Sequence, residues 1–145
     1  MSAPASPPEE PRPPLRHPER VAGLFVTVAW AAPVFAIHGV LAVVLDRDPI
    51  ELPVGPFYGV VAVVLAMLAV YLGIVITVPA RTPWLGAVAT AAAVYLVVLG
   101  TGGVVDLALA FAQAASPFVL IAAGLAAAPP IACWAYFTRR DVQGR

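Results

Sequence analysis

Charge is what this 145-residue chain has least of. Only 11% of its residues are charged, whereas globular proteins have about a quarter. Hydrophobic residues make up 61% of the chain, and the mean hydropathy is +0.92. This composition argues against an ordinary soluble domain and is typical of a protein embedded in lipid. Once the polar tails are set aside, the chain has room for four membrane spans but not for a soluble catalytic domain.

Three residue types are rare or missing. Cys133 is the only cysteine, which excludes an internal disulfide and a cysteine zinc cluster. Because it falls in a predicted span, we expect a small buried hydrophobe rather than a reactive or lipidated thiol. Lysine and asparagine are absent, as in proteins from GC-rich bacterial genomes. The formal net charge is 0, so we expect no nucleic-acid partner.

The sequence also lacks the common catalytic signatures. It has no HExxH, GxSxG, Walker A or CxxC motif. No predicted span has the buried Asp or Glu of a proton-coupled small multidrug exporter. We therefore expect no enzyme activity, no catalytic residue, no cofactor and no metal site. Asp46, Asp48 and Glu51 could offer oxygen ligands to a hard cation, but the EF-hand pattern is absent and we interpret them as solvated acids.

Long uncharged runs are what the sequence has instead. Residues 57–78 contain no charge, and as a helix they would be roughly 33 Å long, close to the ~30 Å hydrocarbon core of a bilayer. Three more spans are predicted at about 21–45, 84–101 and 117–137. The first apolar run continues to Leu45, which favours a retained span over a cleaved leader. The prediction is an all-α integral membrane bundle of four transmembrane helices.

The segments outside these spans are less uniform. Residues 104–115 are apolar but short, so they either lie at the membrane interface or extend the third span. Residues 1–19 are proline-rich and are predicted to be a disordered tail. The membrane domain is placed at 20–138, and 139–145 form a short second tail.

The distribution of arginine predicts the orientation. Seven of the eight Arg residues lie in the two tails or in the turn after the second span, and only Arg47 lies on the other side. By the positive-inside rule, both termini are expected to be cytoplasmic. The predicted location is the plasma (inner) membrane of a bacterium, with the lipid bilayer as the first partner.

Small residues form a stripe along the second predicted span. At helical spacing, one face collects Gly59, Ala62, Ala66, Ala69 and Gly73. In lipid, such stripes let two helix backbones approach closely, so this face is predicted to be a helix-packing surface. Our leading hypothesis is a non-enzymatic protein that acts by packing, either as a homo-oligomer or against a membrane-protein partner.

Pro129 and Pro130 interrupt the fourth predicted span. Each proline removes one backbone donor, and Pro130 is expected to push Pro129 out of the helical region. Transporters place broken helices at their binding sites, where free carbonyl groups meet ions. The alternative is a simple kink whose free carbonyls are satisfied by a neighbouring hydroxyl or by water.

His38 is the only ionisable group well inside a predicted span. Intramembrane ionisable residues are functional candidates, here as a proton relay, yet no span supplies an acidic partner. A neutral, hydrogen-bonded structural role is the other interpretation. Thr27 lies eleven residues earlier, about 20° away around the helix, so the two share a face. With the broken fourth span, His38 motivates the alternative hypothesis of a small transporter or channel.

One run resembles a known family. The sequence DRDPIELPVGPFYGVVAV, at residues 46–63, resembles the corresponding loop in an uncharacterised family of small four-span membrane proteins of actinobacteria. The resemblance covers roughly the first half of the chain. It implies no function and no site residue.

Overall fold

The computed structural model describes residues 18–50, 52–55, 57–80 and 82–143, with side chains between Arg20 and Arg140. This part of the chain is all helix and connecting segments, which confirms the predicted fold class. The six helices are α1 (Pro18–Leu45), α2 (Phe57–Thr77), α3 (Pro83–Val105), α4 (Leu107–Ala114), α5 (Pro117–Leu125) and α6 (Ala128–Gln143). Four stretches are long and apolar enough to cross a membrane: α1, α2, α3, and α5 with α6.

Some stretches of these helices contain many residues that favour strands in water. The first half of α2, for example, is rich in the β-branched residue Val. A bilayer interior offers no water to backbone N–H and C=O groups, so a spanning segment satisfies them within its own helix. α2 and α3 are apolar all round, as helices inside the hydrocarbon core of a bilayer must be.

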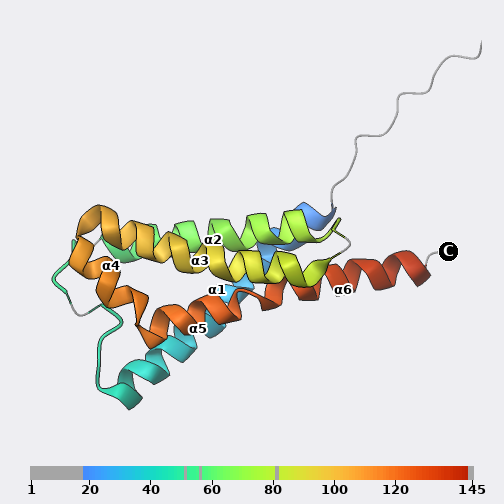
Figure 1. Cartoon of the computed structure of the whole chain (residues 1–145). Coiled ribbons are helices and arrows are strands. Elements are labelled where there is room, and N and C mark those ends of the chain that lie inside the picture. The colour runs from blue at the N-terminus through green and yellow to red at the C-terminus, as the bar shows by residue number, and fades with distance from the viewer. Residues whose placement is uncertain (1–17, 51, 56, 81, 144–145) are drawn as a thin grey trace, which may run out of the picture.

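The helices cross between two ends of an elongated bundle (Figure 1). We call one the termini end, because α1 begins there, α6 ends there, and α2 ends and α3 begins there. The other is the loop end, which holds α4 and the described residues between α1 and α2, 46–50 and 52–55. The antiparallel pair α2–α3 forms the most extensive helix contact. α1 starts beside α2 and runs obliquely until it ends near α5 (Figure 1).

Threonine and glycine interlock α2 with α3. Thr90 fills the space over Gly73, and Thr77 fills the space over Gly86, so a methyl group at either glycine would overlap the opposing side chain. The Thr90 hydroxyl donates to the Gly86 carbonyl of its own helix at 2.7 Å. Two reciprocal pairs hold the termini-end half of the α2–α3 pair at close range, as small residues do in membrane helices.

The densest packing lies in the half of the bundle nearer the termini. Val70 and Ile74 on α2 are fully buried, and they belong to one cluster with Trp30, Ala126 and Cys133. At the termini end itself, the Trp134 indole donates to the carbonyl of Ala80 in the α2–α3 turn at 3.1 Å. Every span therefore contributes to one apolar centre on this side.

The third helix extends beyond the predicted end of the third span at about residue 101. α3 continues through Gly102 and Gly103 to Val105, and the helix stops only where Asp106 takes an extended conformation. Asp106 then caps α4, its carboxylate accepting from the Ala108 N–H at 2.8 Å. Gly102 serves a close approach instead of a helix end: a Cβ there would lie 3.4 Å from the backbone of Ala110.

After Val105 the chain turns, and α4 packs back against α3. For the residues beyond Val105, the alternative that 104–115 extend the third span is therefore wrong. The Tyr95 hydroxyl, ten residues before the end of α3, donates to the carbonyl of Ala114 at 3.0 Å. The end of α4 therefore lies well inside the length of α3, at the loop end (Figure 1). α4 thus precedes the fourth passage through the bundle, which α5 begins at Pro117.

The fourth span is broken, but the expected conformation of its prolines is wrong. The helix is interrupted at Ala126–Ala127, and Pro129 and Pro130 lie inside the first turn of α6. Proline fits there because the first helical N–H groups have no partner within the helix in any case. The Ala126 N–H still donates to Ala122, at 3.0 Å. The break is thus a junction of two helices immediately before the prolines.

Candidate functional site

The structure contains an apolar cavity of about 690 Å³ in the loop-end half of the bundle. It forms because α1 diverges from α2 as it approaches α5 (Figure 1). α1 contributes residues from Trp30 to Ala42, and α2 contributes residues from Tyr58 to Ala66. Val94 and Val98 of α3 and the start of α5 complete the walls. Its volume lies within the range of ~300–1,000 Å³ that is usual for ligand pockets.

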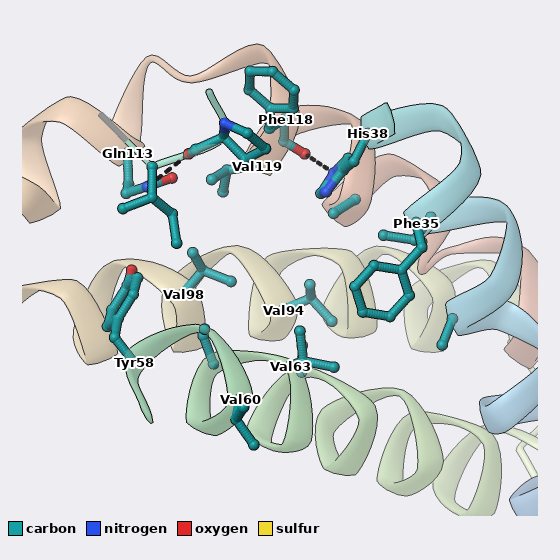
Figure 2. Close-up of a pocket in the computed structure, with 18 of the residues that line it drawn as sticks. Phe35, His38, Tyr58, Val60, Val63, Val94, Val98, Gln113, Phe118 and Val119 are labelled. Atoms are coloured by element: carbon teal, nitrogen blue, oxygen red, sulfur yellow. Dashed lines mark hydrogen bonds between the residues drawn. The ribbon is translucent and has the colours of Figure 1, made fainter. Parts of the chain in front are cut away.

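The lining is chemically simple. None of the described residues that line the cavity is Asp, Glu or Arg, and most are Val, Ala, Phe or Gly. Figure 2 shows Phe35 on α1, Val63 on α2 and Val94 on α3 around the same space. Phe35 and Val60 are 58% and 62% exposed, so they form apolar rims at the outer surface. The cavity therefore suits an uncharged, mainly apolar occupant.

His38 is the most polar side chain on the α1 wall. Its Nε2 lies 2.9 Å from the carbonyl oxygen of Phe118, and its ring meets the Phe118 ring edge-on with centroids 5.5 Å apart. Because a carbonyl only accepts, Nε2 carries the hydrogen and donates it to the Phe118 oxygen. The bond ties α1 to the first turn of α5 (Figure 2).

Gln113 closes the cavity at the loop end. Its side chain is 5% exposed, and its Nε2 donates to the Pro49 carbonyl at 3.2 Å (Figure 2). This bond joins α4 to the connection between α1 and α2. A buried amide so placed fixes the loop without bringing a charge to the site.

Two further polar atoms near the site are buried without a hydrogen-bond partner among the described residues. They are the Tyr58 hydroxyl and the Trp30 indole N–H, and both side chains line the cavity. Tyr58 stands at the loop end (Figure 2), and Trp30 belongs to the packed cluster that closes the opposite end. A buried polar group that stays unpaired costs free energy, so a hydrogen-bond partner for either atom would stabilise the site.

The other predicted polar and hinge positions lie elsewhere. Thr27 is buried, and its hydroxyl has no partner among the described residues. Pro129 and Pro130 are buried in the first turn of α6. None of the three lines the cavity, so the structure does not bring them together with His38.

The predicted small-residue stripe divides into two parts. Gly59, Ala62 and Ala66 line the cavity, whereas Ala69 packs against the buried cluster and Gly73 lies under Thr90. The same kind of residue therefore borders a hollow near the loop end and a close helix contact near the termini. Small residues form a close contact where another helix lies opposite them, and they border a hollow where none does.

The lining residues that sequence reasoning missed include Trp30, Tyr58, Gln113 and Phe118. For Gln113 a signal existed, because it is a polar residue in an apolar run. Tyr58 lies at the start of a span, where an interfacial aromatic is the ordinary interpretation, yet it is buried. No local pattern distinguishes it from its exposed neighbour Phe57.

Comparison with protein-family models, with curated proteins and with solved structures found no match for this chain.

Proposed function

We propose that this multi-pass membrane protein is not an enzyme and acts by packing against a second copy of itself or against a membrane-protein partner. The observation that carries the proposal is an uncovered stripe of small residues on α1. Ala29, Ala32, Ala36 and Gly39 are exposed and fall within about 80° of one another around the helix. In lipid, such a face favours association with another helix.

The position of α1 in the bundle supports this role. In its most apolar 18-residue window 11% of the residues are buried, against 17% in α2 and in α3 and 44% in the fourth span. Within the described chain, nothing lies within 4 Å of the place where a Cβ would be built at Gly39. α1 therefore has a large free surface on which a further helix could dock without displacing any part of this chain.

The proposal includes a location and an orientation. We place the protein in the plasma membrane of a bacterium, with the termini end in the cytoplasm. Of the described residues, Arg20, Arg139 and Arg140 lie in the helices at that end, whereas Asp46, Asp48 and Asp106 lie at the loop end together with Arg47. The resemblance of residues 46–63 to small four-span proteins of actinobacteria supports a bacterial membrane.

The test is the oligomeric state of variants with a blocked α1 face. We expect Ala32→Leu and Ala36→Leu to reduce crosslinked or co-purified complexes in native membranes and mild detergents. Ala92→Leu is the matched control, because it enlarges an exposed alanine on α3. A wild-type protein that is monomeric in several mild detergents and has no crosslinked neighbour in cells would contradict the proposal.

A small transporter or channel is the second candidate. Two features favour it: the helix break at Ala126–Ala127 and a cavity that reaches about halfway along α2. The apolar lining and the hydrogen bond that occupies His38 weigh against an aqueous path. If liposome flux of a transported solute were observed and then lost in His38→Leu and Pro129→Ala/Pro130→Ala proteins, this candidate would replace the first.

A further inference from the structure

We propose that the cavity between α1 and α2 holds one hydrocarbon chain of an uncharged or zwitterionic membrane lipid, which enters sideways from the bilayer. The proposal concerns the cavity walls, which share only Gly39 with the small-residue stripe of α1 described above. It commits to a lipid chain rather than to a second protein, for the four reasons that follow.

The first reason is chemical. The described lining residues carry no carboxylate or guanidinium group, so the cavity offers no partner for a charged ligand. An apolar cavity does not hold water well, because water there would lack hydrogen-bond partners. If the cavity were empty, the side chains of its walls would lack dispersion contacts on the side that faces it. Hydrocarbon fills such a space without either penalty.

The second reason is access. The two rims that flank the opening, Phe35 on α1 and Val60 with Val64 on α2, are apolar and exposed. They belong to the middle or the loop-end half of spanning helices, where the surrounding solvent is lipid. A chain can therefore pass from the bilayer into the cavity without crossing a polar surface.

The third reason is length. Along α2 the cavity extends from Tyr58 to Ala66, which is about 12 Å of helix. Half of the ~30 Å hydrocarbon core is about 15 Å, so the cavity reaches nearly as deep as one leaflet. Below it, Val70 and Ile74 are fully buried and close the path toward the termini end. A space one leaflet deep matches the chain of a lipid from that leaflet.

The fourth reason is polarity along the cavity. Tyr58 and Gln113 lie at the loop end, and the imidazole of His38 lies on the α1 wall (Figure 2). At the closed end, the indole nitrogen of Trp30 is the only polar side-chain atom among the described lining residues. A lipid whose ester groups lie at the loop end and whose terminal methyl approaches Trp30 fits this gradient.

Quenching of Trp30 fluorescence tests the proposal. The full chain with Trp84→Phe and Trp134→Phe retains Trp30 as its only tryptophan. In phosphatidylcholine bilayers brominated in the distal half of the acyl chain, a bound chain brings bromine to Trp30. We expect Trp30 to lose most of its emission, although its side chain is 8% exposed and largely shielded from the surrounding lipid.

Matched substitutions separate the cavity from the rest of the surface. Val63→Phe fills the cavity and is expected to restore the emission, whereas Val88→Phe, on the exposed face of α3, is expected to leave the quenching unchanged. Trp30 emission that bromine does not reduce, or that Val63→Phe leaves equally quenched, would overturn the proposal.

A photocrosslink supplies a readout that retains all three tryptophans. With azidophenylalanine in place of Phe35 at the rim, illumination in phosphatidylcholine vesicles is expected to add the mass of one lipid to the protein. Crosslinking of Phe35 to a second copy, without a lipid adduct, would show that protein covers the cavity and would overturn the proposal.

Discussion

The two halves of the α1–α2 pair use similar residues and reach opposite results. Near the termini, α1 meets α2 closely: a Cβ at Gly23 would lie 3.3 Å from the Ile74 side chain, and Val70 is fully buried. Near the loop, α1 has diverged, and Ala62 and Ala66 face a cavity of about 690 Å³. In lipid, apolar composition alone does not drive two helices together, so close fit decides where they touch.

This contrast has a structural origin at each end. The termini half is held by the Thr–Gly pairs of α2 and α3 and by the bond from Trp134 to Ala80. The loop half is held by polar bonds at its edges, from His38 to Phe118 and from Gln113 to Pro49. The closed half therefore depends on shape, and the hollow half depends on a few hydrogen bonds around its border.

The largest expected effect is a difference in the free energy of unfolding between alanine substitutions at two valines of α2. Val70 and Val63 are seven residues apart on the same face, but Val70 is fully buried while Val63 lines the cavity. We expect Val70→Ala to lower the free energy of unfolding by about 2–3 kcal/mol, because it removes two methyl groups from a packed centre. For Val63→Ala we expect a loss below about 1 kcal/mol. Reversible unfolding in mixed SDS micelles measures both; equal losses would contradict the contrast.

The next effect compares two glycines of the predicted stripe. A methyl group at Gly73 would overlap Thr90, whereas at Gly59 the nearest atom, of Ile50, lies 4.0 Å away. Gly73→Ala is therefore expected to cost about 1–3 kcal/mol through overpacking. Gly59→Ala should be neutral or should stabilise by up to about 1 kcal/mol through the backbone. The same unfolding assay applies, and a stable Gly73→Ala protein would show that the interlock of α2 and α3 is loose.

The smallest effect compares two tyrosine hydroxyls. Tyr95 donates to the Ala114 carbonyl, while the Tyr58 hydroxyl is buried with no partner among the described residues. Tyr95→Phe should cost about 1 kcal/mol, the usual net value of one hydrogen bond. Tyr58→Phe should cost nothing or stabilise slightly, since it removes an unsatisfied group. Thermal unfolding in detergent ranks the two; a larger loss at Tyr58 would reveal a partner for its hydroxyl in the membrane.

The sequence predicts the parts of this fold that composition decides. Four uncharged runs are enough to predict four spanning helices, because lipid forces each run to satisfy its own backbone. A proline pair is likewise enough to predict a broken fourth span, although the break falls at Ala126–Ala127, just before the pair. These features are local, so a single segment contains the information needed.

The features that depend on partners could not be predicted. Gly102 and Gly103 are weak helix formers, yet α3 passes through them because Gly102 packs against the backbone of α4. The Thr–Gly pairs require knowing which helices are neighbours, and the cavity requires knowing where α1 diverges. His38 was identified as a candidate by its charge chemistry, but its partner, a backbone carbonyl at Phe118, leaves no mark in the sequence.

The contact between acyl chains and α2 tests the central contrast most directly. In lipid nanodiscs with methyl-labelled valine, nuclear Overhauser effects report which methyl groups touch lipid chains. We predict cross-peaks from acyl-chain protons to the methyl groups of Val63, which lines the cavity, and none to those of Val70, which is fully buried. Contacts from α1 methyl groups to Val63, with no lipid signal, would show that α1 packs along the whole of α2 and would contradict a hollow half.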